Sequence, residues 1–330
     1  MSQFSNNSSL RQFHTPLEKL RDLESHLHFH IKGQDHVIPR VVSVLKRGEL
    51  NLAHPSRPRG SFLFVGPTGT GKTEITLTFS NYLFGEGKLF RFDMSEFQNQ
   101  SSVGLLLGQS STDNGLLGRI LSKHDRGTIL FDEMEKAHPL VLDLFLQILD
   151  AARITTSDGV THSLSNFYVI LTSNIGAAES MRMEHSSPAT IERTVLRKVE
   201  QTLRPEFVAR ITDRIVFLRL TYEVQREIAT LVAHKELARL KTLGYDLELS
   251  KEALEFLIRK GYDRFLGARP MRNTVERFVQ DAIVKGLIQD NLEGTCIVDV
   301  DPGNEKLVLK TTTVADSLQE EEDQTDLAAA

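Results

Sequence analysis

One run of eight residues in this chain combines the residue types that hold a phosphate group. It consists of Gly66, Pro67, Thr68, Gly69, Thr70, Gly71, Lys72 and Thr73 and matches G-x-x-x-x-G-K-[ST] at every fixed position. The glycines allow a tight bend whose backbone N–H groups point inward, and the helix that begins near Lys72 adds the positive end of its dipole. Lys72 would neutralise the β- and γ-phosphates of a nucleotide, and the Thr73 hydroxyl would be a Mg²⁺ ligand. The run therefore predicts a nucleoside triphosphate site with Mg²⁺, against the alternative of a glycine-rich turn that binds nothing.

Two adjacent carboxylates supply the chemistry that such a site still needs. Asp132 and Glu133 directly follow the apolar run GTILF. A carboxylate beside the metal holds Mg²⁺ or its water, which suits Asp132, and hydrolysis needs a group that positions or deprotonates the attacking water, which suits Glu133. The alternative is that the pair caps the helix that follows. Its place after a strand and downstream of the phosphate loop favours catalysis.

The elements that must position these residues alternate between strand and helix. Short apolar runs predict strands at 61–65, 89–93, 127–131, 167–174 and 214–218, and periodic segments predict helices from Thr15, at 34–50, at 72–83 and at 139–151. This alternation indicates an α/β fold, a parallel sheet with helices on both faces. Ligands of such sheets bind at the carboxyl ends of the strands, where the candidate residues lie.

A second, smaller domain is expected after residue 220. Helical patterns cover 221–243, 250–260 and 268–288, and two short strands follow at TCIVDVD and KLVLK. The sequence therefore predicts a flexible tail at 1–14, a large domain at 15–220, a small α+β domain at 221–311 and a disordered acidic tail at 312–330.

Composition excludes several classes of protein. The chain has 330 residues, a net charge of −5 and a single cysteine, Cys296. We expect no internal disulfide, no global basic field for nucleic acid and, since no window approaches 18 apolar residues, no membrane span and a cytoplasmic location. His26, His28 and His30 offer no complete ligand set, so we interpret them as solvated or packing histidines rather than a metal site.

Seven segments together resemble the Clp-type AAA+ ATPases, in particular the second ATPase module of the Clp disaggregases and unfoldases with its small C-terminal domain. The segments are KGQD, GSFLFVGPTGTGKTE, FDMSEF, ILFDEMEKAHP, ILTSNIG, RPEFVARITDRIVF and GARPMRN, spread over about residues 20–310. The resemblance implies the AAA+ P-loop NTPase fold, a five-stranded parallel sheet between helices followed by a mostly helical lid domain. It also implies an ATP hydrolase that uses Mg²⁺ and works as a homo-oligomeric ring, in the family a hexamer.

The same resemblance assigns further residues of the site. Asn174 matches the family's sensor of the γ-phosphate, and Arg269 matches the sensor of the small domain. Arg210 matches the arginine finger that is offered to the neighbouring subunit, where a guanidinium stabilises developing phosphoryl charge. Ile31 and Gln34 lie at positions that line the adenine pocket in the family.

The chain departs from the family at the loop that grips polypeptide. The interval between Phe97 and Gly127 contains no Phe, Tyr or Trp, and polar residues occupy 109–114, where gripping residues are expected. No tripeptide for docking a partner protease is seen between Ala177 and Leu203. We therefore expect an unfoldase-type chaperone that remodels a protein substrate, with substrate and adaptor unidentified. The alternatives are a non-threading remodeller of one dedicated complex, a nucleic-acid motor or loader, and an ATP-regulated scaffold.

Overall fold

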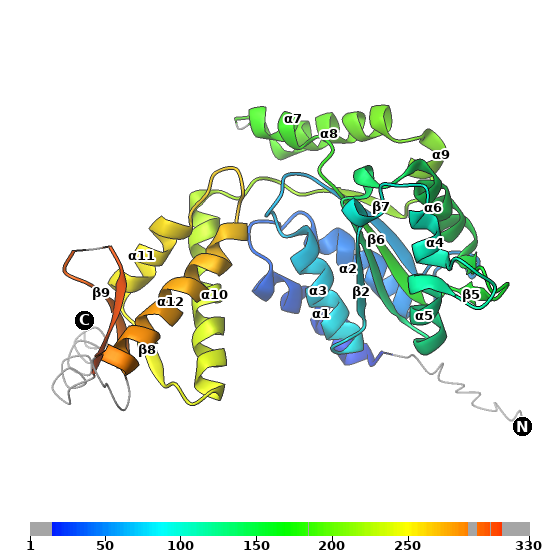
Figure 1. Cartoon of the computed structure of the whole chain (residues 1–330). Coiled ribbons are helices and arrows are strands. Elements are labelled where there is room, and N and C mark those ends of the chain that lie inside the picture. Colours follow the sequence, from blue (N-terminus) through cyan, green and yellow to red (C-terminus); the bar gives the residue numbers. More distant parts are fainter. Residues whose placement is uncertain (1–14, 184, 290–295, 304, 312–330) are drawn as a thin grey trace, which may run out of the picture. The chain divides into compact units, whose positions relative to one another are not determined.

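The computed structural model describes residues 15–183, 185–289, 296–303 and 305–311 (Figure 1). The chain divides into two compact units between Arg219 and Leu220, one residue before the expected domain boundary. The predicted tails at 1–14 and 312–330 lie outside the described residues.

The first unit is built on a five-stranded parallel sheet with the strand order β2-β3-β6-β1-β7. Its strands are β1 (Gly60–Val65), β2 (Leu89–Asp93), β3 (Gly127–Asp132), β6 (Phe167–Ser173) and β7 (Asp213–Val216). The three central strands are buried along their whole length, as expected for strands covered on both faces. The predicted five-stranded parallel sheet between helices is confirmed.

Successive residues of each strand face opposite sides of this sheet and build two cores. In β1, Phe62 and Phe64 pack with the helices on one face, whereas Leu63 and Val65 pack on the other. Figure 1 shows α1, α2 and α3 on the first face and α4, α5 and α6 on the second. The helices of the unit are α1 (Leu17–His30), α2 (Ile38–Glu49), α3 (Lys72–Phe84), α4 (Ser102–Leu107), α5 (Gly115–Lys123), α6 (Pro139–Ala151), α7 (Ala177–Arg182), α8 (Pro188–Thr202) and α9 (Pro205–Val208), with the 3-10 turns η1 (Met94–Glu96) and η2 (Met134–Lys136).

The expected helix at 34–50 begins four residues late, at Ile38. Gly33 has φ +68°, and Pro39 occupies the first turn of α2, a position that suits proline because no N–H is needed there. Gln34 therefore lies in a turn before the helix. In α6, Leu144 and Leu149 are buried, whereas Leu140, in the first turn, is 43 % exposed.

A two-stranded hairpin, β4 (Arg153–Thr155) and β5 (Thr161–Ser163), was not expected from the sequence. Ile154 is fully buried and anchors it, and Gly159 turns the chain with φ +82°.

The second unit packs three helices around a small sheet with the strand order β10-β9-β8. Its elements are α10 (Tyr222–Thr242), α11 (Lys251–Gly261), α12 (Arg269–Gln289), β8 (Leu247–Leu249), β9 (Cys296–Val300) and β10 (Leu307–Thr311). Cys296 is buried within its core. This small, mostly helical α+β unit agrees with the prediction, apart from the unexpected strand β8.

Within the described ranges, no helix combines the length and apolar character needed to cross a bilayer. The same residues hold no cluster of three or more His, Cys, Asp or Glu side chains suited to a metal. His26 instead stacks on Tyr82, with ring centroids 4.1 Å apart.

Candidate functional site

The phosphate loop connects β1 to α3 at the carboxyl edge of the sheet, where a ligand is expected. Among the described residues, none of the backbone N–H groups of 68–71 donates a hydrogen bond to protein. Gly66 has φ +134°, and a Cβ there would lie 2.3 Å from the carbonyl oxygen of Phe217. The loop is thus pressed against the end of β7 and keeps a row of donors available, an arrangement that fits an anion.

Lys72 is the cation of this loop and is only 8 % exposed. Its ammonium donates to the carbonyl oxygens of Gly66 (2.6 Å) and Pro67 (2.8 Å) and to Oδ1 of Asn174 (3.2 Å). Burial lowers the pKa of Lys72 from 10.5 to about 8, although the charges of Asp132 and its neighbours oppose the shift. Lys72 is therefore a desolvated cation directed at the loop.

Asp132 and Glu133 end β3 beside the loop. The Asp132 carboxylate accepts hydrogen bonds from the Thr172 hydroxyl and from the guanidinium of Arg91 on β2. Glu133 adopts the left-handed conformation, with φ +56° and ψ +49°, which is uncommon for a residue with a side chain and is concentrated at functional sites. Its carboxylate pairs with Lys136 and accepts a hydrogen bond of 3.3 Å from the Asn174 amide.

Asn174, directly after β6, bridges the two charged groups of the site. Its side-chain oxygen accepts from Lys72 at 3.2 Å, and its side-chain nitrogen donates to Glu133 at 3.3 Å. The structure therefore brings together the predicted cation, carboxylate and sensor, drawn from three neighbouring strands of the sheet.

The residues present fit a Mg²⁺-bound nucleotide. The Thr73 hydroxyl, in the first turn of α3, makes no hydrogen bond within the described part of the chain, and the Asp132 carboxylate lies at the same edge of the sheet. A hydroxyl and a carboxylate supply oxygen donors of the kind that Mg²⁺ shares with phosphate oxygens.

Of the two residues expected at the adenine, Gln34 contacts the phosphate loop directly. Gln34 is fully buried, and its amide donates to the carbonyl oxygens of Thr70 (3.3 Å) and Leu218 (2.8 Å) while accepting the Leu218 N–H (3.1 Å). Ile31 is 4 % exposed in the core beside it. Gln34 thus links the phosphate loop to the segment after β7.

Arg210 lies at the opposite edge of the same sheet. It precedes β7, which runs parallel to β1 with Asp213 opposite Phe62, so it lies near the amino ends of the strands. Its guanidinium donates to the Glu206 carbonyl oxygen at 2.7 Å and lies 3.4 Å from Asp150 at the end of α6. A six-residue strand spans roughly 20 Å, so Arg210 cannot contact the phosphate loop of its own chain.

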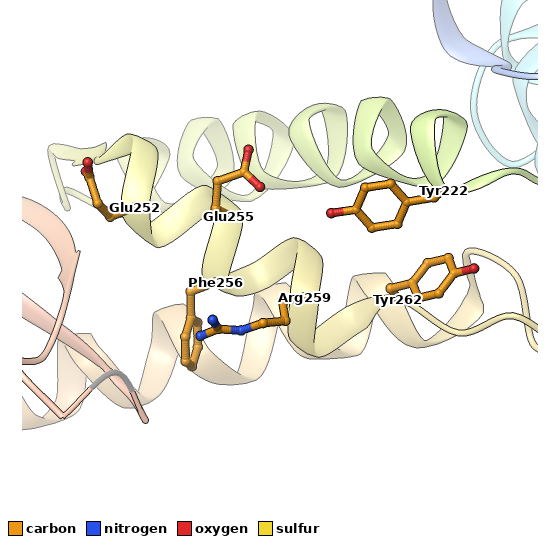
Figure 2. A pocket seen from close by; sticks show the side chains of 6 residues that line it. All are labelled: Tyr222, Glu252, Glu255, Phe256, Arg259 and Tyr262. Carbon is orange, nitrogen blue, oxygen red and sulfur yellow. The ribbon is translucent and has the colours of Figure 1, made fainter.

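Arg269 is the first residue of α12 in the second unit, and its side chain is exposed. That unit also contains a hollow of about 420 Å³, shown in Figure 2, between the start of α10 and α11. It is lined by Tyr222, Glu252, Glu255, Phe256, Arg259 and Tyr262. None of the predicted site residues lines this hollow.

The polar interval at 109–114 forms a closed turn between α4 and α5. The Asp113 carboxylate accepts the N–H groups of Gln109 (3.2 Å) and Gly115 (3.0 Å) and a hydrogen bond from Arg119 (3.1 Å). These bonds lower the pKa of Asp113, that from Gly115 most. Ser157, in the loop of the β4–β5 hairpin, donates its hydroxyl to the Gly108 carbonyl oxygen at 2.6 Å. The turn is therefore held in one shape and attached to the hairpin.

Three residues of the site were missed by sequence reasoning: Arg91, Glu135 and Thr172. Each directly contacts a predicted residue. Thr172 and Glu135 stand two residues from Asn174 and Glu133, respectively, so proximity in sequence was the one available signal.

Two family models match the chain. Residues 57–214 match the AAA domain (Cdc48 subfamily), and residues 220–300 match the C-terminal, D2-small domain of ClpB protein. The two matches fall in the two compact units of the structure.

Curated relatives and solved structures agree with these models. The chain is 38 % identical over 305 residues to the chaperone protein ClpB of Aquifex aeolicus, covering 87 % of this chain and 30 % of that protein. It is 37 % identical over 310 residues to the mitochondrial chaperone protein ClpB4 of Arabidopsis thaliana, covering 89 % and 32 %.

Among solved structures, an S. cerevisiae Hsp104–ADP complex matches with a TM-score of 0.81 and 31 % identity, covering 90 % of this chain and 53 % of that one. A closed-state reconstruction of Hsp104 with ATPγS and FITC casein matches with a TM-score of 0.79 and 30 % identity, covering 89 % and 52 %. The chain spans about a third of the length of the curated relatives and about half of the solved chains.

Proposed function

The chain belongs to the Clp-type AAA+ ATPases, as a second-type ATPase module with its small C-terminal domain, and from this membership we propose that it hydrolyses ATP with Mg²⁺ to remodel protein substrates. One observation carries the proposal. Lys72, Glu133 and Asn174 form a continuous set of contacts beside a loop whose N–H groups are available to an anion.

Each residue has a role that follows from its geometry. The loop N–H groups and Lys72 bind and neutralise phosphate oxygens, and Thr73 and Asp132 would hold Mg²⁺, which would supply charge stabilisation at the phosphates. Glu133 takes the proton of the attacking water, and Asn174 orients that water because its amide lies between the carboxylate and the cation. For Arg269, the role of phosphate sensor rests on the family resemblance alone. Gln34 and Ile31 border the adenine by the same resemblance, and Gln34 also supports the loop through its bond to the Thr70 carbonyl oxygen.

We further propose that the active sites are shared between subunits of a ring, as a hexamer. The supporting observation is the position of Arg210, at the amino edge of the sheet that carries the phosphate loop at its carboxyl edge. A finger placed there reaches a phosphate only in a neighbouring copy.

The alternative activity is the remodelling of one dedicated complex without threading of polypeptide, and the turn at 109–114 favours this alternative. A turn closed by Asp113 and built of polar residues offers hydrogen bonds at fixed positions, whereas sequence-independent gripping of polypeptide needs bulky apolar contact. Unfolding of a tagged fluorescent protein with ATP separates the two outputs, because a dedicated remodeller leaves that substrate folded.

A mixing experiment tests the shared site. Glu133→Gln should lower ATP turnover by about 10²–10⁴-fold with nucleotide affinity retained, and Arg210→Ala should also abolish turnover. When the two variants are mixed in equal amounts and form rings at random, a site works only where a copy with Glu133 lies beside a copy with Arg210. This arrangement arises at about one position in four, so the mixture should recover roughly a quarter of wild-type turnover. A mixture as inactive as its parts would contradict the shared site, and unchanged turnover of Glu133→Gln would contradict the chemistry.

A further inference from the structure

The backbone pairing of β3 with β6 stops one residue before the chemistry begins. The last paired residues are Phe131 and Leu171, and the catalytic positions Asp132, Glu133 and Asn174 lie beyond them. Backbone N–H groups that leave a sheet into a partly buried site still need acceptors, because an unpaired buried donor is costly. The structure provides these acceptors from two side chains.

Each of the two side chains accepts a backbone N–H from the segment that follows the other strand. Thr172, on the β6 side, accepts the backbone N–H of Glu133 with its hydroxyl oxygen at 3.0 Å. Glu135, in η2 on the β3 side, accepts the backbone N–H of Asn174 with Oε1 at 2.9 Å. Each segment therefore holds the backbone of the other, and the two bonds continue the connection between the strands where the ladder has ended.

These bonds set the positions of three functional groups. The Thr172 hydroxyl, while accepting from Glu133, donates to the Asp132 carboxylate. Its bond to the Glu133 N–H also holds a residue whose left-handed backbone would otherwise relax. On the other side, the Glu135 bond fixes the backbone of Asn174, whose amide contacts both Lys72 and Glu133.

We propose that Thr172 and Glu135 are a reciprocal pair of positioning residues that holds the water-activating carboxylate and the sensor amide in register for hydrolysis. This inference rests on the ATPase function proposed above. Neither residue needs to touch the nucleotide, since each acts through a neighbour's backbone. Misplacement of reacting groups by about 1 Å costs on the order of 10²-fold in rate. The loss of either bond should therefore lower turnover and leave nucleotide affinity nearly unchanged.

A purely structural role for Glu135 is the competing explanation. Its second oxygen, Oε2, is buried and has no hydrogen-bond partner among the described residues. In the part of the chain that the structure describes, the one hydrogen bond that this carboxylate makes is to the Asn174 N–H, and burying Oε2 costs stability. The carboxylate is therefore better explained by the position it gives to Asn174.

The test compares variants of the full chain that remove or keep each acceptor. Glu135→Leu and Thr172→Val remove it at similar volume, and Glu135→Gln and Thr172→Ser keep it. Glu86→Leu, an exposed site in the turn after α3, is the matched surface control. For each we measure kcat and KM for ATP, the Kd of a fluorescent nucleotide, the melting temperature, and amide hydrogen exchange at Glu133 and Asn174 without nucleotide.

We expect kcat to fall about 10- to 100-fold in Glu135→Leu and Thr172→Val, with KM and Kd changed less than about threefold. Without nucleotide, exchange should accelerate about 5- to 15-fold at the Asn174 amide in the first variant and at the Glu133 amide in the second, the value of one lost hydrogen bond. Glu135→Gln and Thr172→Ser should recover most of the turnover. The double variant should lose less than the product of the single losses, because the two bonds hold the same pair of segments.

Several results would overturn the inference. A folded Glu135→Leu chain with wild-type kcat would refute the positioning role of Glu135. A fall in kcat that comes with a clear loss of nucleotide affinity and a clear fall in melting temperature would refute it as well. If Glu135→Leu fails to fold, the pair Thr172→Val and Thr172→Ser decides the matter from the other segment. A wild-type chain with no turnover at any concentration would refute the proposed function itself, which separates that failure from the failure of the pair.

Discussion

The close approach of Gly66 to Phe217 gives the sharpest test of how the phosphate loop is held. Gly66→Ala would place a Cβ 2.3 Å from the Phe217 carbonyl oxygen, about 1 Å closer than a carbon–oxygen contact of roughly 3.3 Å allows. The strand end cannot easily move away, because the Phe217 N–H donates to the Val65 carbonyl oxygen at 2.8 Å. The φ of +134° adds about 1–3 kcal/mol of backbone strain, and overpacking adds about 1–3 kcal/mol.

Gly85→Ala is the control for strain alone. Gly85, after α3, has φ +84°, and a Cβ there would meet nothing within 4 Å. Chemical denaturation of the full chain, followed by circular dichroism, should therefore show Gly66→Ala less stable than Gly85→Ala by about 1–3 kcal/mol. Since the loop must shift by about 1 Å, ATP turnover of Gly66→Ala should fall on the order of 10²-fold. Equal stability of the two variants, with turnover retained in Gly66→Ala, would refute this account of the loop.

Three further perturbations probe other parts of the chain. Arg59→Met should cost about 3–5 kcal/mol in urea unfolding, because it leaves the fully buried Glu49 carboxylate without its cation and with only the hydroxyls of Thr15 and Tyr168 as donors. The double variant Glu49→Gln/Arg59→Met should recover part of that loss, and a double variant as unstable as Arg59→Met would contradict this. A hydrogen bond from a neighbouring arginine lowers the pKa of Glu236 below its usual 4.5, so its stabilisation is complete above that value and disappears as the pH falls through the lowered pKa. Glu236→Gln should therefore flatten the acid side of a melting-temperature series, and an unchanged slope would argue against it. Asp113→Ala should speed amide exchange at Gln109 and Gly115 several-fold, since these two N–H groups lose their acceptor, and unchanged exchange would mean that the turn is held by other contacts.

The sheet and the main site residues were predictable because both have short-range signatures. Strands buried on both faces read as continuous apolar runs, and a phosphate loop requires glycine, lysine and threonine at fixed spacing. Parallel strands then place every carboxyl end at one edge, which brings Asp132 and Asn174 to the loop without knowledge of the strand order. The family resemblance added the roles of Ile31, Gln34, Asn174, Arg210 and Arg269, and these roles stay predictions.

The missed elements include the three-residue strands β4, β5 and β8, because so short a segment shows too little periodicity to detect, and also the longer helix α8. The β4–β5 hairpin nevertheless carried a usable signal. Asp158-Gly159 is a favoured turn dipeptide, and the alternating segments beside it are typical of hairpin strands. β8 has only Leu247 and Leu249 on one face and pairs with β9, far along the chain, so its pairing could not be found locally.

The contacts that complete the site depend on register, which no local pattern encodes. Glu135 reaches the Asn174 N–H only because β3 and β6 are adjacent and their ladder ends at Phe131 and Leu171. A shift of one residue would turn Thr172 to the other face of the sheet and remove its bonds to the segment after β3. The candidate catalytic residues could thus be recognised one at a time from the sequence, whereas the residues that position them can be identified only once the strand pairing is known. For a site of this kind, the residues that position the catalytic groups should be sought in the first four positions beyond the last paired residues of adjacent strands, where backbone donors lose their partners and side chains must replace them.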